Sequence, residues 1–281
     1  SSLKVTVTAA QTANTGNLAP VQIIEGNNIA DLGWGAAGAK TVTLSFWVRS
    51  SLTGTFGGSL RNSASNRSYP FTYTISVADT WEYKTITIAG DTSGTWLTTN
   101  GIGIKVRFSL YAVASSLQSA GTWYAGSATG ATGQTQLAST NGATFYITGV
   151  QLEKGSTATD FEHRTFGDEL ALCQRYYFRE TAGTTFAGFA IAVVEAVTYS
   201  SGMMRGLPVP MRSLPTCNVS NCRMFDGSAA PAVTSLGNNW SSKTTWGVSV
   251  IGSAGGMTVG RACMLTANNN ILAYIEATAE L

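Results

Sequence analysis

Apolar and polar residues alternate one by one along Thr41–Arg49, which has the sequence TVTLSFWVR. The apolar set of this segment is Val42, Leu44, Phe46 and Val48. Because successive side chains of a β-strand point to opposite faces of a sheet, this period of two predicts a strand with one buried face. The spacing recurs in two further apolar sets, Phe71, Tyr73, Ile75 and Val77, and Ile102, Ile104, Val106, Phe108 and Leu110. We therefore expect a mainly β protein.

Segments rich in Gly, Ser, Thr and Asn separate these strands and predict loops at 53–66, 90–101 and 121–141. Further strands are expected at 3–8, 21–24 and 144–152. A bulge is expected near Lys84 and Thr85, because Trp81 and Ile86 fall on opposite parities. Short antiparallel strands spaced by such loops predict an antiparallel β-sandwich of the jelly-roll type over residues 1–164.

The pattern changes after residue 164. Thr165 or Asp168 is a suitable N-cap for a short helix at 168–178, in which apolar residues recur at helical spacing. A second, smaller β domain is expected over 165–281, with strands at 185–198, 216–219, 246–251, 257–265 and 272–279. The proline-rich segment LPVPMRSLPT at 207–216 predicts an edge or an extended connector.

Charge is sparse in this chain. Lys and Arg number 17 and Asp and Glu number 15, which gives a formal net charge of +2 with 11% of residues charged. Such a balance creates no broad field that would attract phosphate-rich partners, so we expect no nucleic acid partner. No run of about 18 apolar residues occurs, so we expect no membrane insertion.

The four cysteines do not form a recognisable disulfide or metal motif. Cys173, Cys217, Cys222 and Cys263 are scattered, and reduced thiols are expected. Cys217 and Cys222 would need two further ligands to bind zinc, and the single histidine, His163, is distant in sequence. We therefore expect no cofactor, although carbonyl-rich loops can hold a structural Ca²⁺ without a recognisable motif.

Several longer motifs resemble the C-terminal part of tailed-bacteriophage virion proteins of the tail-fibre or tail-spike type. They are TVTLSFWVRSSLTGTFGGSLRN at 41–62, RSYPFTYTI at 67–75, WEYKTITIAGDTSGTW at 81–96, ITGVQLEKGSTATDFEHR at 147–164 and ELALCQRYYF at 169–178. The first half is similar to carbohydrate-binding jelly rolls. The resemblance implies a homotrimer on the phage tail that contacts other tail proteins and host cell-surface glycan, with a virion-anchoring region upstream. It supplies no catalytic residue.

Aromatic and amide residues in the predicted loops form the candidate glycan site. Sugars present C–H faces that stack on aromatic rings and hydroxyl groups that pair with amides and guanidinium groups. The candidate rings are Trp34, Tyr69, Trp96, Trp123 and Tyr124. Their candidate polar partners are Arg61, Asn62, Asn66, Arg67 and Gln134. The alternative is that each ring fills space under a loop or at a subunit contact. Trp47 lies on the polar parity of its strand, which favours a subunit contact.

Two other functions remain open. A polysaccharide depolymerase would need a pair of carboxylates. The available acids are Asp31, Asp91, Asp160, Asp168, Glu195 and Asp226, and none forms a recognisable catalytic motif. We therefore expect no enzymatic activity. A purely structural virion component, such as a fibre connector or a head decoration, is the first alternative, favoured by the low charge, and the depolymerase is the second.

Overall fold

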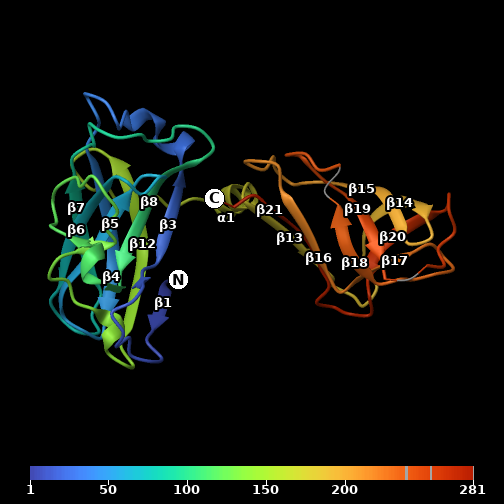
Figure 1. The fold of residues 1–281 in the computed structure, drawn as a ribbon, viewed down its shortest axis with the longest axis horizontal. Helices are drawn as coiled ribbons and strands as arrows, with labels where there is room; N and C mark the ends of the chain where they lie inside the picture. The colour runs from blue at the N-terminus through green and yellow to red at the C-terminus, as the bar shows by residue number, and fades with distance from the viewer. Residues whose placement is uncertain (238–239, 254, 281) are drawn as a thin grey trace. The chain divides into compact units, whose positions relative to one another are not determined.

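The computed structural model describes residues 1–237, 240–253 and 255–280, and the side chains of residues 201 and 202 lie outside this description. The protein is mainly β, as the alternation predicts. It divides into two compact units, Ser1–His163 and Arg164–Leu281, and the ribbon in Figure 1 runs from blue in the first to red in the second. This boundary precedes the expected one by one residue. Among the described residues, no helix is long and apolar enough to cross a membrane.

Two four-stranded antiparallel sheets build the first unit. One has the order β1 (Leu3–Thr6), β12 (Thr144–Lys154), β4 (Val42–Ser50) and β7 (Glu82–Ile88). The other has the order β3 (Val21–Glu25), β8 (Ile102–Ser109), β5 (Gly54–Arg61) and β6 (Ser68–Ile75). Smaller elements are β2 (Asn17–Leu18), β9 (Tyr111–Ala112), β10 (Leu117–Gln118) and β11 (Gly130–Ala131), with 3-10 turns η1 (Gly26–Leu32), η2 (Ala114–Ser116) and η3 (Leu137–Ser139).

One hydrophobic core joins the inner faces of these two sheets. Phe46 of β4 lies 5.0 Å from Tyr73 of β6 and 5.0 Å from Phe108 of β8, measured between ring centroids. Phe56 of β5 lies 6.3 Å from Phe145 of β12. Because these pairs bridge the two sheets, the first unit is a β-sandwich. Its jelly-roll connectivity stays a prediction.

Strand β5 corrects the prediction of a loop at 53–66. It is a central strand that pairs with both β6 and β8, and nearly all of it is buried. A Cβ at Gly57 would lie 2.3 Å from Gln134 Oε1, and one at Gly58 would lie 2.3 Å from the Arg107 carbonyl oxygen. The glycines that resemble a loop signal are therefore required by close packing on both faces of the strand.

The bulge expected near Lys84 and Thr85 is absent. Strand β7 pairs with β4 in a continuous register from Val42↔Ile88 to Val48↔Glu82. Glu82 and Lys84 share the inward parity with Ile86 and form an ion pair with each other at 2.6 Å. The charges of Glu82 and Lys84 therefore neutralise each other on the inward face of β7, and Tyr83 lies on its outward face.

The second unit contains a helix and two antiparallel sheets. Helix α1 spans Phe166–Gln174. The larger sheet has the order β17 (Cys222–Phe225), β20 (Ala262–Ala267), β14 (Gly188–Ala196), β15 (Tyr199–Gly206), β19 (Thr245–Gly252) and β18 (Val233–Gly237). The smaller has the order β13 (Tyr177–Thr181), β21 (Tyr274–Thr278) and β16 (Thr216–Ser220).

A separate core fills this unit. Trp246 of β19 is completely buried in it, and its indole N–H donates to the Glu276 carbonyl of β21 at 3.1 Å. Residues of both sheets, including Leu265 and Ile275, belong to the same cluster. This core explains why Trp246 anchors its strand, whereas Trp240 is exposed.

Helix α1 begins where the capping residues predict but ends early. The Thr165 hydroxyl accepts a hydrogen bond from the Asp168 backbone N–H at 3.3 Å, so Thr165 is the N-cap. The expected end at residue 178 is wrong, because β13 already begins at Tyr177. The second half also contains four strands that the pattern did not predict, β13, β15, β17 and β18.

Candidate functional site

Most of the predicted glycan-binding rings are buried together in the first unit. Trp34 and Trp96 lie 4.7 Å apart, and Trp123 lies 5.3 Å and 5.4 Å from them. Trp34 and Trp96 are only 7% and 6% exposed. Tyr69 is also buried and contacts Trp123 at 5.2 Å. The prediction that these rings are open to solvent is wrong for Trp34, Tyr69 and Trp96, because they form a small aromatic core.

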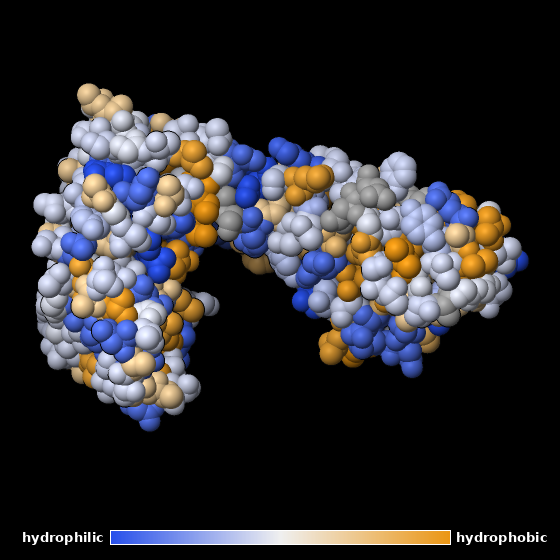
Figure 2. All heavy atoms as spheres, viewed as in Figure 1, coloured by the Kyte–Doolittle hydropathy of each residue, from blue (hydrophilic) through white to orange (hydrophobic). Residues whose placement is uncertain are grey.

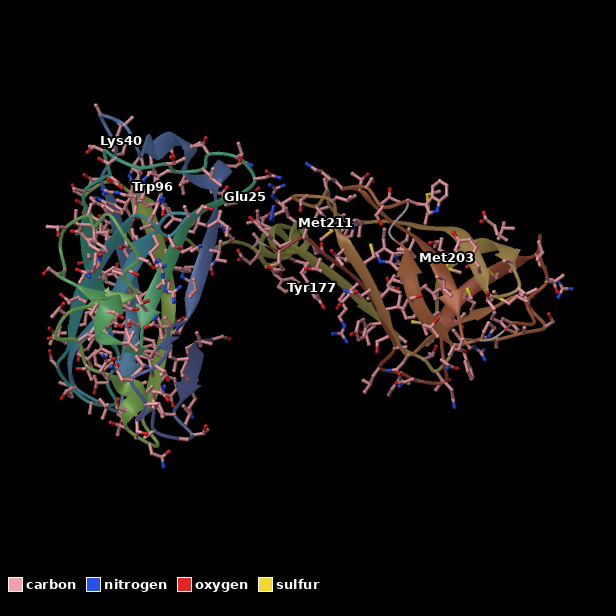
Figure 3. All side chains as sticks on the ribbon, in the orientation of Figure 1. Glu25, Lys40, Trp96, Tyr177, Met203 and Met211 are labelled. Atoms are coloured by element: carbon pink, nitrogen blue, oxygen red, sulfur yellow. The ribbon has the colours of Figure 1, made fainter. Side chains whose placement is uncertain are left out.

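Hydrogen bonds close this aromatic core at one end of the unit. The Trp34 indole donates to the Lys40 carbonyl at 2.7 Å, and Figure 3 shows Lys40 and Trp96 at the same end. The Trp123 indole donates to the Ala89 carbonyl at 2.8 Å. Tyr124, by contrast, is exposed, so it keeps its place as a candidate contact with a ligand.

The predicted polar partners hold loops in place. Arg67 donates from Nε and Nη2 to the buried Asp91 carboxylate at 2.8 and 2.5 Å. The Asn62 amide nitrogen donates to Asn66 Oδ1 at 2.7 Å, and Asn62 Oδ1 accepts from the backbone of Asn66 and Arg67. Because these groups satisfy one another, Asn66 and Arg67 stabilise the hairpin after β5.

Arg61 and Gln134 are likewise buried rather than free for a sugar hydroxyl. The Arg61 guanidinium donates to the Ser127 hydroxyl, and the Gln134 amide donates to the Ser109 hydroxyl at 2.7 Å. Arg61 ends the central strand β5, and Gln134 lies in the loop after β11, where its side chain packs against β5 and β8.

A different group of rings lies on the outer face of the sheet β1-β12-β4-β7. Trp47 and Tyr83 are opposite each other in the register of β4 and β7, and their ring centroids lie 5.3 Å apart. They are 44% and 43% exposed. Trp81, also exposed, contacts Tyr146 of β12 at 6.2 Å. We call Trp47, Trp81, Tyr83 and Tyr146 the aromatic platform.

Two cations accompany the aromatic platform. The Arg49 guanidinium lies 5.0 Å and the Lys4 ammonium 5.5 Å from the centroid of the Tyr146 ring. Arg49 Nη2 also donates to Asp79 Oδ1 at 3.2 Å. Exposed rings next to oriented N–H donors match the two features of a saccharide, its C–H faces and its hydroxyl groups.

Local backbone structure shapes the border of the aromatic platform. A bulge between Thr148 and Gln151 interrupts the pairing of β12 with β4 just after the pair formed by Thr148 and Trp47. Gly149 in this bulge has φ +58°, and a Cβ there would lie 3.4 Å from Trp47 Cδ1 and 3.9 Å from Phe161. The indole of Trp47 therefore lies against the bulged backbone, with Phe161 beside it.

Only one residue of the aromatic platform could be predicted from the sequence. The polar parity of Trp47 indicates an outward ring, and its exposure is confirmed. Tyr83 and Tyr146 join it only through the register of β7 and β12 against β4. Strand register cannot be obtained from the alternation of one strand, so these partners were missed.

Three of the six candidate acids, Asp31, Asp91 and Asp226, form contacts within the fold. Asp31 pairs with Lys154 at 2.5 Å, and Asp91 pairs with Arg67. Asp226 accepts hydrogen bonds from the backbone N–H groups of Ser228, Ala229 and Thr258 at 2.9, 2.8 and 2.7 Å. These donors hold the pKa of Asp226 well below its ordinary value, so its carboxylate is a stable loop anchor.

The cysteines are free thiols, and three of them are buried. Burial raises the pKa of Cys222 to about 11 and also raises the pKa of Cys217. Such groups remain protonated near neutral pH and pack as small apolar side chains. No group of three or more His, Cys, Asp or Glu that would suit a metal ion occurs within the described residues.

The outer face of the larger sheet in the second unit carries exposed aliphatic side chains, whereas the aromatic platform consists of rings. Ile191 is 67% exposed and lies opposite Met264 in the register of β14 and β20. Figure 2 shows hydrophobic residues in several groups on the visible surface of this unit. We define the aliphatic face as the exposed side chains Ile191, Val193, Met204, Ile251 and Met264.

Comparisons with known proteins give no further assignment. No family model matches the chain, and no curated protein matches it significantly. The resemblance of its motifs to phage tail proteins thus stays a prediction.

Proposed function

We propose that this chain is a non-catalytic virion protein of a phage tail fibre or spike that binds host cell-surface glycan. The aromatic platform is the proposed contact surface, and Arg49 and Lys4 supply hydrogen bonds to sugar hydroxyl groups. The support comes from two independent sources, the resemblance of the sequence motifs and the chemistry of this surface. The protein would act at the host surface during attachment of the virion.

The exposed pair Trp47 and Tyr83 is the single observation that carries this proposal. A subunit contact is the competing explanation for Trp47, because aromatic residues are also enriched at protein interfaces. A saccharide fits better because the rings share their face with Arg49 and Lys4, which retain N–H groups that a dry interface would have to desolvate.

Binding to a panel of purified bacterial surface polysaccharides tests this proposal. Trp47→Ala should weaken binding by at least about tenfold, the equivalent of about 1.4 kcal/mol. Trp240→Ala is the matched control, since Trp240 is an exposed tryptophan of the second unit. Equal binding by the wild type and Trp47→Ala, or no binding to any polysaccharide, would contradict the proposal.

A homotrimer is the proposed assembly, with the aliphatic face as its subunit contact. Exposed aliphatic residues on adjacent strands form the kind of surface that a second copy covers. Ile191→Lys should shift the oligomer toward monomer in light scattering at micromolar concentration, whereas Lys40→Gln should not. A wild-type monomer at this concentration would contradict the assembly.

A purely structural role in the virion is the second candidate, and the same aliphatic face favours it because it suits packing against other tail proteins. Electron microscopy of the virion separates the two roles. An aromatic platform buried inside the tail would favour the structural role, and an outward-facing platform would favour glycan binding.

A further inference from the structure

Three cations gather on the outer face of the sheet β3-β8-β5-β6, on the other side of the sandwich core from the aromatic platform. Arg61 of β5 is directly opposite Lys105 of β8, and Arg107 is opposite Ser59 in the same register. Side chains two residues apart on a strand share a face, so Lys105 and Arg107 point the same way. We call Arg61, Lys105 and Arg107 the cationic cluster.

Within the described residues, the side chains of Arg61 and Lys105 donate hydrogen bonds to neutral oxygen atoms. Arg61 donates to the Ser127 hydroxyl. Lys105 Nζ donates to the Ser63 carbonyl at 2.9 Å and to the Ser65 hydroxyl at 3.2 Å. Across the part of the chain that the structure describes, no ion pair joins any of the three cations to a carboxylate.

The cluster also contains hydrogen-bond donors without acceptors. The Nε atoms of Arg61 and Arg107 are buried and have no hydrogen-bond partner among the residues that the structure describes, and the Arg61 residue is only 8% exposed. A buried donor on a charged group is costly to leave unsatisfied. Native proteins leave few such groups, and each one calls for a physical explanation.

The pKa shifts of these side chains are those expected of buried cations that lie close to one another. Burial lowers the pKa of Arg61, and the charge of Arg107 lowers it further. Burial, followed by the charges of Arg61 and Arg107, lowers the pKa of Lys105. Because a guanidinium stays protonated in proteins, the charges persist and repel one another unless an anion neutralises them.

We propose that the cationic cluster binds the oxyanion group of an acidic saccharide, such as the carboxylate of a uronic acid. This inference rests on the proposed glycan-binding function and adds a second glycan contact, specific for acidic sugars, on the other side of the sandwich from the aromatic platform. A guanidinium fork fits a planar carboxylate with two parallel hydrogen bonds. Lys105 and Arg107 are partly exposed and would contact the carboxylate, whereas the buried Arg61 contributes its charge from beneath them. A nucleic acid is a poorer fit, because the net charge of +2 provides no extended basic surface.

An acidic oligosaccharide and its carboxyl-reduced form test the ligand class. Titration calorimetry with a hexuronate-containing oligosaccharide should show at least about tenfold tighter binding than with the reduced, neutral form. Arg107→Gln and Lys105→Gln should each remove most of this difference. Lys40→Gln is the matched control, since it removes one exposed charge from the same unit, and it should retain the difference.

The outcomes separate this inference from the proposed function. Equal binding of both forms would overturn the acidic-sugar assignment and leave glycan binding intact. Binding of neither form would overturn the proposed function, and the inference with it. Inorganic sulfate that binds as tightly as the acidic oligosaccharide would show a site for free oxyanions and would also overturn the saccharide assignment.

The stability of Arg107→Gln provides a second readout. If the three cations lie together in order to bind a ligand, they repel one another when no ligand is bound. Arg107→Gln removes one of these charges, so it should melt at a higher temperature than the wild type in chloride buffer. Sulfate at matched ionic strength should stabilise the wild type more than the variant, because a ligand that binds only the folded state raises stability. A variant that melts lower than the wild type in chloride would indicate a structural arginine and would overturn the inference.

Discussion

In the first unit the outer face of the sheet β1-β12-β4-β7 carries rings and cations, whereas in the second unit the outer face of the six-stranded sheet carries aliphatic side chains. Both units fill their inner faces with ordinary apolar cores. The inner faces therefore account for folding in both units. The outer faces differ in their side chains and therefore in the partners that we propose for them, a saccharide in one unit and another protein surface in the other.

The same difference extends to how each unit satisfies a buried carboxylate. In the first unit Arg67 neutralises Asp91 with two hydrogen bonds. In the second unit three backbone N–H groups surround Asp226. A guanidinium thus satisfies the buried carboxylate of the first unit, whereas backbone N–H groups satisfy that of the second.

The largest expected effect tests whether the two cores are independent. Trp246→Ala removes a completely buried indole and its hydrogen bond to Glu276, so it should destabilise the second unit by about 3–5 kcal/mol. Thermal unfolding followed by calorimetry should show the transition of the second unit at lower temperature and that of the first unit unchanged.

Trp240→Ala is the matched control for this experiment. Trp240 is exposed, so its removal should change stability by no more than about 0.5 kcal/mol. A shift of both transitions by Trp246→Ala would show that the units unfold together, and the comparison of separate cores would fail.

A smaller effect is expected from glycine in the two units. Gly58→Ala places a Cβ 2.3 Å from the Arg107 carbonyl oxygen and 2.4 Å from the Phe71 ring, so it should destabilise the first unit by about 1–3 kcal/mol. Gly188→Ala in β14 meets no atom within 4 Å and should be nearly neutral. Chemical denaturation of both variants measures the difference, and equal costs would disprove the close packing of β5.

Glycine also shows where sequence reasoning succeeds and where it fails. The alternation in β4 predicted its strand and the outward position of Trp47, because period two depends only on local geometry. The Gly-rich segment of β5 was predicted as a loop, because close approach of Gln134 and Arg107 to its backbone is a tertiary property. Composition alone cannot distinguish a crowded strand from a flexible loop.

The burial of the candidate glycan-binding rings also depends on tertiary contacts and could not be predicted from the sequence. Trp34 and Trp96 lie in polar segments, and nothing local indicates that Trp123 returns to cover them. Their burial depends on contacts between distant segments. Tyr83, in contrast, could be placed beside Trp47 once the register of one strand pair is known.

A moderate effect is expected at the aromatic platform. Tyr83→Ala removes one of the two paired rings, so affinity for a bound polysaccharide should fall by about threefold to tenfold, up to about 1.4 kcal/mol. Val193→Ala removes a similarly exposed side chain from the aliphatic face and should leave this affinity unchanged. An equal loss in both variants would remove the functional distinction between the two outer faces.

The smallest expected effect appears only in acid and concerns Asp226. Its pKa is lowered by hydrogen bonds from the backbone of Ala229, Thr258 and Ser228, so its ionised form stabilises the second unit above its ordinary pKa of 3.8. This contribution should be lost as the pH falls from 3.8 toward the depressed folded value. Asp226→Asn has no charge to lose and keeps one carbonyl acceptor, so its stability should fall less over this range.

Unfolding free energies of both proteins between pH 2 and pH 6 measure the effect. Because Asp226 anchors only the second unit, the transition of the first unit should be identical in the two proteins, and parallel pH profiles for the second unit would contradict the assigned role of the carboxylate.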